Sequence, residues 1–470
     1  MAYNKLTLPK KFSFSALLVI ALVFLTFVSC DDDDDPAGPS TNIVQLAQSN
    51  SNLSTLVTAL GKFPDLVSTL GGTGEFTVFA PTNEAFANLL TTIGQTSLND
   101  IPDDVLREVL EYHVIAGETV RSTDLTNGDV ETVNGEAITV SITGGVKLNG
   151  TVNVTAADVA ATNGIVHVVD AVLVPPSMVQ FVNTVVEPAY FNKNFTTLIA
   201  AVKAASPSIL ATLLNSSKKT LFAPTNAAFE AAGITSLPAQ SVLDAVLGYH
   251  VIASEVASSA IATGSSSATT LNGKIYLSKG ASGVFINGTS KVTTADITAS
   301  NGVVHVIDRT LLPPSKTIAA IVSDYANASS NKQFTQLLAA LARTDGEGAD
   351  DLLAAVTSSS SNLTVFAPTD AAFNSLYTAL GVDNVNEIPL GTLIAVLKHH
   401  VVGARAFSSD LANGQVGTLN GNVTVSVSDN PPSVTGSSGS GNKANLQTTL
   451  LNIHATNGVI HVIDKVLIPD

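Results

Sequence analysis

The residues best suited to acid–base chemistry in this sequence are a histidine and an aspartate within an octapeptide that occurs three times. The octapeptide reads NGIVHVVD at 163–170, NGVVHVID at 301–308 and NGVIHVID at 457–464. Each histidine lies between valine or isoleucine residues, where a ring nitrogen most often finds a structural hydrogen-bond partner. Each aspartate follows the apolar run, where we expect it to cap the backbone. The residues are His167, His305 and His461, with Asp170, Asp308 and Asp464. The octapeptide therefore predicts a buried closing strand.

A second set of histidines follows the end of a predicted helix in each copy. The pairs are Tyr112-His113, Tyr249-His250 and His399-His400. An imidazole at this place satisfies terminal helix carbonyls and suits the negative end of the helix dipole. The alternative is a ligand contact through Tyr112, His113, Tyr249 and His250, a pattern from which the third copy departs.

Other polar residues differ between the copies. Asp158 and Asp296 lie five residues before the last Asn-Gly of their copies, and Asn452 takes this place in the third. An acid replaced by an amide fits a turn better than it fits catalysis. His454 has no histidine counterpart, so we expect an incidental surface residue.

The sequence contains no local signature of an active site. A metal site needs several converging donors, whereas the chain offers adjacent His399-His400, no His-x-x-x-His pair and the single cysteine Cys30. It has no Gly-x-Ser-x-Gly elbow and no glycine-rich phosphate loop. We therefore predict no metal, no cofactor and no enzyme, although catalysis by residues scattered in sequence stays open.

A second repeated phrase precedes each octapeptide and reveals the domain organisation. It reads TVFAPT from Thr77, TLFAPT from Thr220 and TVFAPT from Thr364. Phrases repeated in this order, roughly 140 residues apart, indicate three domains with cores of their own. The predicted segments are a signal peptide at 1–29, a spacer at 30–40, and copies 1, 2 and 3 at 41–177, 178–315 and 316–470.

The first half of each copy has helical periodicity. In copy 1, apolar residues between Ile43 and Leu70 predict two short amphipathic helices. Phe76–Ala80 reads as a buried strand, after which Thr82 or Asn83 caps a helix. Asp103-Asp104 then opens a helix that continues over Val105–Glu111, since acids suit a helix N-terminus.

The second half changes to period two, which predicts short antiparallel strands. Asn134-Gly135, Asn149-Gly150 and Asn163-Gly164 fit two-residue type I′ hairpins. The plan is α+β, with N-terminal helices packed on a small antiparallel sandwich or wedge. In copy 3, Pro431–Asn445 reads as a mobile loop. The proline pairs that end copies 1 and 2, Pro175-Pro176 and Pro313-Pro314, predict extended junctions.

The N-terminus predicts export and lipidation. Lysines lead into an uncharged run over Phe12–Ser29, as in a secretory signal. The end of this run, Phe27-Val28-Ser29-Cys30, resembles a bacterial lipobox with Cys30 as the lipidated residue; the alternative is a simple membrane anchor. Asp31–Asp35 then form a solvated spacer, which also resembles the surface-export signal of some Gram-negative lipoproteins.

Composition narrows the classes of partner. The net charge is −16 and charged residues make up only 13% of the chain. Acidic character disfavours nucleic-acid binding and electrostatic docking on anionic membranes. The membrane contact that we predict is the lipid on Cys30.

The paired phrases resemble the fasciclin domain. T-[VL]-FAPT-[ND]-x-AF, then Tyr-His, then NG-[IV]-[VI]-H-V-[VI]-D cover nearly everything from Thr41 to Asp470, three times. The resemblance implies compact α+β domains in tandem, extracellular work in adhesion or matrix contact, and no common catalytic residues. In animal relatives the Tyr-His region has been linked to integrin contact, which motivates the ligand reading of Tyr112-His113 and Tyr249-His250.

The leading hypothesis is a lipid-anchored adhesion protein on the bacterial outer membrane, exposed at the cell surface, that binds an extracellular protein, matrix or glycan surface. A second hypothesis is a glycan-binding accessory lipoprotein, against which the absence of tryptophan counts. A third is a hydrolase, which requires a pocket with convergent titratable groups.

Overall fold

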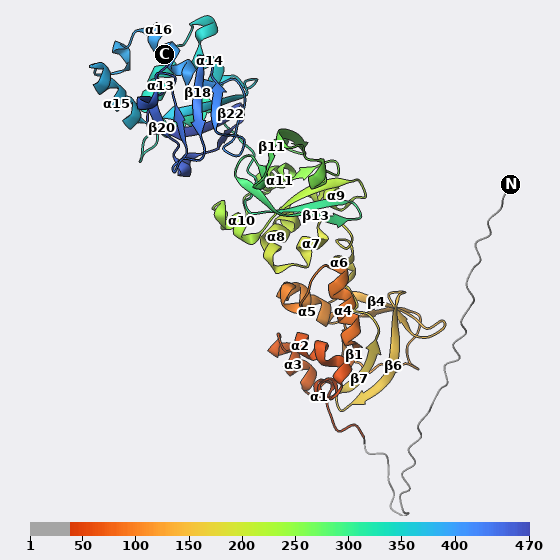
Figure 1. Cartoon of the computed structure of the whole chain (residues 1–470). Coiled ribbons are helices and arrows are strands. Elements are labelled where there is room, and N and C mark those ends of the chain that lie inside the picture. The colour runs from red at the N-terminus through yellow and green to blue at the C-terminus, as the bar shows by residue number, and fades with distance from the viewer. Residues whose placement is uncertain (1–37) are drawn as a thin grey trace, which may run out of the picture.

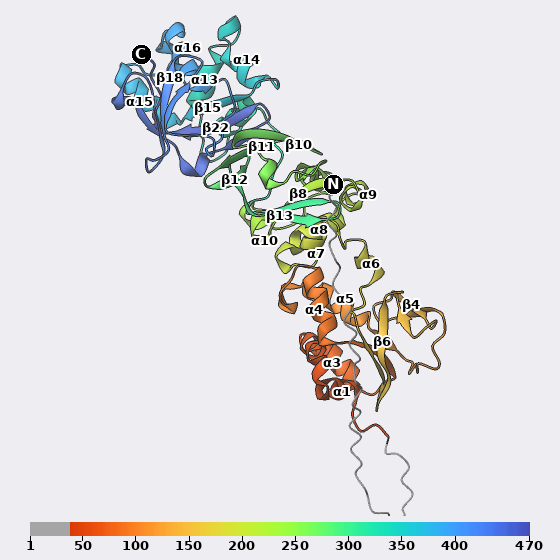
Figure 2. The same ribbon diagram turned by 45° about the vertical axis from the view of Figure 1, so that its right-hand side comes forward.

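The computed structural model describes residues 38–470 as three α+β units that follow one another in an elongated row (Figures 1 and 2). The signal segment, Cys30 and Asp31–Asp35 lie outside the described residues. No helix within residues 38–470 has the length and apolar character required to cross a bilayer.

Copy 1 begins with helices and ends with strands. Its helices are α1 (Ile43–Ser49), α2 (Ser54–Leu60), α3 (Pro64–Gly71), α4 (Asn83–Thr92) and α5 (Asp103–Glu111). Its strands are β1 (Phe76–Pro81), β2 (Val114–Ala116), β3 (Gly128–Glu131), β4 (Ala137–Ser141), β5 (Lys147–Leu148), β6 (Val152–Ala161) and β7 (Gly164–Val169). The predicted α+β plan is confirmed.

Local chemistry explains where these helices start. Thr82 caps α4 by accepting the Ala85 N–H, and Asp103 and Asp104 lie in the first turn of α5. The prediction of two helices before β1 was wrong, because there are three. Asn50 caps a short 3₁₀ turn ahead of α2, and a proline, Pro64, opens α3, where its missing N–H is no loss.

The two repeated phrases are neighbouring strands. Copy 1 has one seven-stranded sheet in the order β2-β1-β7-β6-β5-β4-β3. β1 and β7 run parallel, with Phe76 opposite Gly164 and Pro81 opposite Val169, while the other pairs are antiparallel. β1 lies between β2 and β7 in the sheet, which accounts for the burial of every residue in it, including the polar Thr77.

Copy 2 repeats this plan. Its helices are α6 (Pro176–Val179), α7 (Glu187–Tyr190), α8 (Thr196–Ala204), α9 (Pro207–Leu214), α10 (Asn226–Ala231) and α11 (Gln240–Tyr249). Its strands are β8 (Lys219–Pro224), β9 (Val251–Ile252), β10 (Gly264–Thr270), β11 (Gly273–Gly280), β12 (Gly283–Ile286), β13 (Ser290–Ala299) and β14 (Gly302–Ile307). Their order is β10-β11-β12-β13-β14-β8-β9. Pro176 opens α6, so the first proline pair leads into a helical turn instead of an extended linker.

Copy 3 divides its strands between two four-stranded sheets, β16-β15-β22-β21 and β17-β18-β19-β20. Its helices are α12 (Ile318–Ala326), α13 (Thr335–Ala342), α14 (Leu352–Thr357), α15 (Asp370–Leu380) and α16 (Leu390–His399). Its strands are β15 (Leu363–Pro368), β16 (Val401–Val402), β17 (Gly414–Gly417), β18 (Asn422–Ser426), β19 (Ser433–Thr435), β20 (Lys443–Asn445), β21 (Ile453–Ala455) and β22 (Gly458–Ile463).

The prediction of a mobile loop at Pro431–Asn445 was wrong. This segment contains β19 and β20, which pair antiparallel with Ser433 opposite Asn445. Ser433 and Ala444 are fully buried, so the glycine- and serine-rich stretch between them is the turn of a packed hairpin.

The three predicted Asn-Gly turns have different outcomes. At Asn134-Gly135 the prediction was wrong, because only Gly135 has a positive φ and the connection from Glu131 to Ala137 is longer than two residues. Asn149 (φ 49°) and Gly150 (φ 75°) both have positive φ, as the predicted type I′ turn requires. At Asn163-Gly164 the turn prediction was wrong: Ala161 pairs with Gly164, so Thr162 and Asn163 form the connection. Glycine is required at 164 because β1 passes too close for a side chain: a Cβ there would lie 2.0 Å from the Phe76 carbonyl oxygen.

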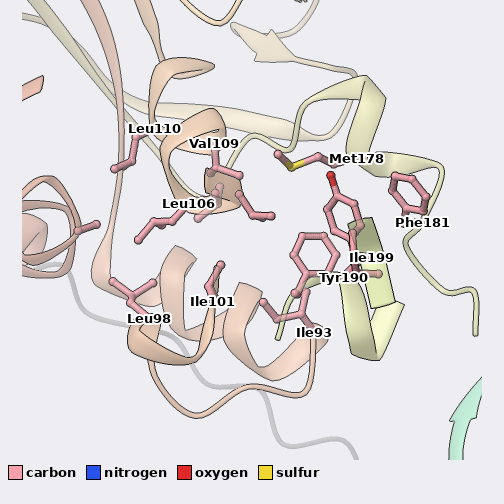
Figure 3. Packing of buried hydrophobic residues seen from close by; sticks show 14 of the residues in the cluster. Ile93, Leu98, Ile101, Leu106, Val109, Leu110, Met178, Phe181, Tyr190 and Ile199 are labelled. Carbon is pink, nitrogen blue, oxygen red and sulfur yellow. The ribbon is translucent and has the colours of Figure 1, made fainter. Parts of the chain in front are cut away.

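Copies 1 and 2 share an apolar joint. Side chains from α4, α5 and the segment between them meet Met178, Phe181 and Tyr190 of copy 2 in one continuous cluster (Figure 3). Phe181 and Tyr190 stack with ring centroids 4.3 Å apart. The Lys193 ammonium donates to the Asn99 carbonyl across the joint at 2.6 Å.

Candidate functional site

The asparagine of each octapeptide ties the two ends of its copy together. Asn163 Oδ1 accepts the Ile43 N–H at 3.0 Å, and its Nδ2 donates to the Leu70 and Gly72 carbonyls at 2.8 and 2.9 Å. Asn301 and Asn457 make the equivalent bonds. One buried amide thus satisfies the start of the first helix and the end of α3 or its equivalent.

The central histidine holds the segment after β2 against the sheet. His167 donates from Nε2 to the Val120 carbonyl at 2.9 Å and accepts the Asp158 N–H at Nδ1. Thr77 Oγ1 accepts the Val120 N–H and donates to the Glu118 carbonyl. Copies 2 and 3 repeat this arrangement, so both repeated phrases fasten the same segment. This is the structural role that we predicted for these histidines.

The histidine after the helix is also committed to the backbone. His113 donates from Nδ1 to the Val109 carbonyl at 2.6 Å and accepts the Leu173 N–H at Nε2 at 2.9 Å. His250 and His400 do the same. Burial lowers the pKa of each of the three to about 4. The prediction that they satisfy a helix carbonyl is confirmed, but as neutral rings, so attraction of a charged ring to the helix dipole has no part in it.

The tyrosines before these histidines are buried as well. Tyr112 donates its hydroxyl to the Ala137 carbonyl at 2.7 Å and accepts from Asn149 Nδ2 at 3.0 Å. Tyr249 is held by Lys274 and Asn287 in the same way. Ligand contact at Tyr112, His113, Tyr249 and His250 therefore requires local opening of the copy, and it stays a prediction.

Copy 3 replaces this tyrosine by His399. Its Nδ1 donates to the Asn420 carbonyl at 2.6 Å, and its Nε2 accepts the Ser437 N–H at 3.3 Å. Ser437 belongs to the turn between β19 and β20. The imidazole thus anchors the additional hairpin of this copy.

The aspartates at the octapeptide ends cap backbone groups, as predicted. Asp170, Asp308 and Asp464 each accept a main-chain N–H, at 2.8, 2.7 and 2.7 Å. The carboxylates earlier in copies 1 and 2 also have a structural role. Asp158 accepts both the N–H and the hydroxyl of Ser122, and these bonds lower its pKa.

Asn452 occupies the equivalent place in copy 3 but faces a neighbouring copy. Its Oδ1 accepts the Ser408 N–H at 2.7 Å, as a carboxylate would, while its Nδ2 donates to the Gly288 carbonyl of copy 2 at 3.1 Å. A carboxylate has no N–H to give to that carbonyl. The amide therefore serves the joint between copies 2 and 3 in addition to the predicted turn.

Other residues complete this polar joint. Asp410 accepts hydrogen bonds from Ser265 and Ser278 of copy 2, the first at 2.7 Å. The Arg405 guanidinium lies 4.4 Å from the centre of the Tyr276 ring, a favourable cation–π geometry. Phe407 packs on Gly288, where a Cβ would lie 2.4 Å from it.

The prediction of His454 as a surface residue was wrong. Its ring lies edge-on to Tyr276 of copy 2 and Phe407, at centroid distances of 6.0 and 5.3 Å. Burial and the Arg405 charge lower its pKa to about 3. The sequence signal was the departure from the other copies, which marks residues used between copies.

A cleft of about 700 Å³ adjoins the other joint, between α4 of copy 1 and the sheet of copy 2. Its lining is rich in hydroxyl and amide side chains, and Glu187 is its ionisable group. Glu187 is 9% exposed, accepts the Asn183 N–H, and has a pKa raised by burial. Sequence reasoning missed this cleft because its walls come from segments more than 100 residues apart.

The described residues contain no group of three or more His, Cys, Asp and Glu side chains placed to hold a metal ion. Each recurring histidine donates from one ring nitrogen to a main-chain carbonyl and accepts a main-chain N–H at the other. These rings stabilise segments of the fold, and within the folded copies they are not free to transfer protons.

Comparison with known proteins identifies the repeated unit. The model of the fasciclin domain matches residues 51–175, 193–313 and 332–469. Protein sll1483 of Synechocystis sp. is 43% identical over 135 residues, which cover 28% of this chain and 73% of that protein. Immunogenic protein MPT70 of Mycobacterium tuberculosis is 34% identical over 155 residues, or 30% of this chain and 77% of that protein.

Longer relatives match several copies at once. Periostin of Homo sapiens is 28% identical over 365 residues, covering 73% of this chain but only 38% of periostin. Among solved structures, a FAS1 domain pair from the insect cell adhesion molecule fasciclin I matches 58% of this chain and 96% of its own, at 17% identity and a TM-score of 0.28.

Proposed function

The chain belongs to the fasciclin domain family, and we propose that it is a lipid-anchored cell-surface protein that adheres to extracellular partners through its three domains. The observation that carries this proposal is the tandem array of three copies behind a lipobox-like Cys30 and an acidic spacer. The chain spans about two fifths of the length of periostin.

The commitment of the repeated polar residues to internal bonds supports adhesion over catalysis. Both nitrogens of the recurring histidines are occupied, and the octapeptide aspartates cap backbone groups. Adhesion requires no such titratable groups. Three domains on one chain raise the effective concentration of every weak contact, so avidity supplies affinity without new chemistry.

We also propose that Cys30 carries the lipid that anchors the array to the outer membrane, with Asp31–Asp35 as the spacer that displays it. The order of apolar run, cysteine and acidic stretch supports this address. More than one acyl chain is needed for stable anchoring. In the test, Cys30→Ser should move the protein from the membrane fraction to the soluble exported fraction. Unchanged membrane association would contradict lipid anchoring.

Adhesion is tested separately from anchoring. A deletion strain should attach less to neighbouring cells or to surfaces, and complementation with the natural chain should restore attachment. The Cys30→Ser chain is the matched control, because it keeps all three domains but loses the proposed tether. Normal attachment of the deletion strain, with no binding by the purified three-domain chain, would refute adhesion. Proteolysis of intact cells reports whether the domains are outside.

Glycan binding is the second candidate function. The cleft of about 700 Å³ with its hydroxyls, amides and one carboxylate favours it, since such groups hydrogen-bond sugar hydroxyls. A glycan array probed with the natural chain and with Glu187→Gln tests this candidate. Binding that Glu187→Gln weakens would support a glycan site in the cleft, and the absence of hits would discard it.

A further inference from the structure

Each copy joins two of its helices by the same hydrogen bond. The second residue of α2, α8 or α13 donates its main-chain N–H to the side-chain oxygen of the residue that opens α4, α10 or α15. The pairs are Thr55–Asn83 at 2.8 Å, Thr197–Asn226 at 3.0 Å and Gln336–Asp370 at 2.9 Å. A buried phenylalanine follows in the first turn of the second helix, namely Phe86, Phe229 or Phe373. The three helix pairs can therefore be compared residue by residue.

In copy 3 an aromatic ring packs beside this helix pair. Tyr377 follows Phe373 by one turn of α15, and their ring centroids are 6.1 Å apart. Its hydroxyl donates to Gln336 Oε1 on α13 at 3.0 Å. The residue is only 5% exposed, and burial raises the pKa of its hydroxyl. Copy 1 has Leu90 at the equivalent position of α4, half-buried against the core. Both copies thus place a large side chain one turn after the phenylalanine.

Copy 2 has no side chain at this position. α10 has 6 residues, against 10 in α4 and 11 in α15, and Gly233 stands in the place of Tyr377 with a φ of 72°. A groove of about 530 Å³ remains, lined by α8, α10 and residues 234–237. Thr197 and Phe229, the counterparts of both neighbours of the Tyr377 ring, belong to this lining. The groove therefore lies where copy 3 places its ring.

The lining of the groove suits a ring from another molecule. Ile234 and Leu237 are half-buried, so part of each apolar side chain stays accessible from the groove. Thr197 and Asn226 add a hydroxyl and an amide. Glu230 is the ionisable residue of the lining and is exposed, which disfavours an acidic ligand. Aromatic side chains that enter apolar pockets with a few polar groups are the strongest anchors of protein interfaces.

We propose that this groove binds an aromatic side chain of a protein partner, in the position that Tyr377 occupies in copy 3. The ring packs beside Phe229, as aromatic pairs favour, and covers Ile234 and Leu237. The hydroxyl of a tyrosine would end near Thr197, the counterpart of Gln336. The protein nature of the partner rests on the adhesive function proposed above, whereas binding of the ring is measured on the purified chain.

NMR titration of the whole three-copy chain tests ring binding through the methyl signals of Ile234 and Leu237. The probes are N-acetyltyrosinamide and N-acetylphenylalaninamide, with the leucine and glycine amides and glucose as counterparts. A bound ring shifts nearby methyl signals by its ring current. We expect saturable shifts with both aromatic amides at roughly millimolar concentration, as befits a single side chain. The leucine amide should bind more weakly, and the glycine amide and glucose should cause no saturable shift.

A matched pair of variants makes the test specific. Ala200 lies on α8, is exposed and lines the groove, so Ala200→Phe should fill the groove with a ring of the chain itself. Affinity for the aromatic amides should then fall at least about tenfold. Thr58→Phe, at the equivalent exposed position of α2 in copy 1, is the control and should leave affinity unchanged. Because both positions are exposed, both variants should melt like the natural chain.

The same two variants connect the groove to adhesion. Cells that carry Ala200→Phe should attach as poorly as the deletion strain, and cells that carry Thr58→Phe should attach normally. Normal attachment with Ala200→Phe, where the deletion strain attaches poorly, would overturn the groove as the partner site but leave adhesion standing. Ring binding by the purified chain, with normal attachment of the deletion strain, would refute adhesion and retain the groove.

Three results of the titration would overturn ring binding itself. One is the absence of saturable shifts with either aromatic amide. Another is binding that Ala200→Phe leaves undiminished. The last is a stronger response to glucose or to the leucine amide than to the aromatic amides, which would assign the groove to a sugar or to an aliphatic side chain.

Discussion

Replacement of the octapeptide asparagine in copy 3 should open that copy selectively. Asn457 is fully buried, accepts the Ile318 N–H at 2.8 Å, and donates to the Val356 and Ser358 carbonyls at 2.8 and 3.0 Å. Asn457→Ala removes all three bonds and orphans groups at two helix ends. At about 1 kcal/mol for each bond, copy 3 should lose about 3 kcal/mol, which raises its opening equilibrium roughly a hundredfold.

Asn457→Asp separates shape from hydrogen bonding. The variant keeps the acceptor for Ile318 but directs a carboxylate oxygen at two carbonyls, so it should be at least as destabilising at pH 7 as Asn457→Ala. The folded state raises the pKa of the new carboxyl above its unfolded value near 3.9. The loss should therefore be largest at neutral pH and shrink as pH falls toward that value, where the protonated carboxyl can donate.

Peptide-resolved hydrogen exchange suits this measurement, because the chain has no tryptophan. Amides of β15 and β22 should exchange roughly a hundredfold faster in Asn457→Ala, while those of β1 and β7 in copy 1 serve as the internal control. Unchanged protection in copy 3, or an equal loss in copy 1, would refute the assignment of the asparagine as the tie within one copy.

Three further predictions follow from the same contacts. Asn452→Asp should loosen the joint between copies 2 and 3, which small-angle scattering would show as a wider distance distribution. Copy 3 should stay folded, because an aspartate serves the same turn in copies 1 and 2. An unchanged distribution would argue against the bond to Gly288. Gly164→Ala should destabilise copy 1 by several kcal/mol in urea unfolding, since the new Cβ would lie 2.0 Å from the Phe76 carbonyl oxygen. A urea midpoint for copy 1 within error of that of the natural chain would disprove the close approach. The stability that the buried histidines contribute should be fully present above about pH 6.5 and be lost as pH falls to 4, because burial holds their folded pKa near 4, below the ordinary value of 6.5. These residues are His113, His250, His400 and His461, and thermal melts across pH check this prediction.

Much of the fold could be predicted because its signals are local. The apolar run at Phe76, the cap at Thr82 and the acids opening α5 each act within a few residues. The role of Asn163 could not be read in this way, since its partner Ile43 is 120 residues away. The Asn-Gly dipeptide suggested a turn, but the requirement for glycine comes from a neighbouring strand.

The joints between copies were harder still to predict. Residues such as Asp410, Arg405 and His454 gain their role only when a second domain is placed beside them. Their signal in the sequence is a mismatch between copies, and Asn452 carried it. From the sequence alone, Asn452 in place of an aspartate is explained by a turn. Its second role requires the position of copy 2, because Gly288 of that copy accepts the Asn452 side-chain N–H.

The parallel pairing of β1 with β7 has a consequence for biosynthesis. β1 cannot pair with its parallel neighbour until β7, which begins at Gly164, has been synthesised. Asn163, which accepts the Ile43 N–H at the start of α1, is synthesised immediately before β7. When such a chain emerges N-terminus first, the central strand pair of each copy cannot form until the octapeptide appears. Non-local closure of this kind slows folding. Each copy therefore stays incompletely folded, and able to pass through an export channel, until its final strand has emerged. The three copies then complete their sheets one after another, in the order in which they leave the channel.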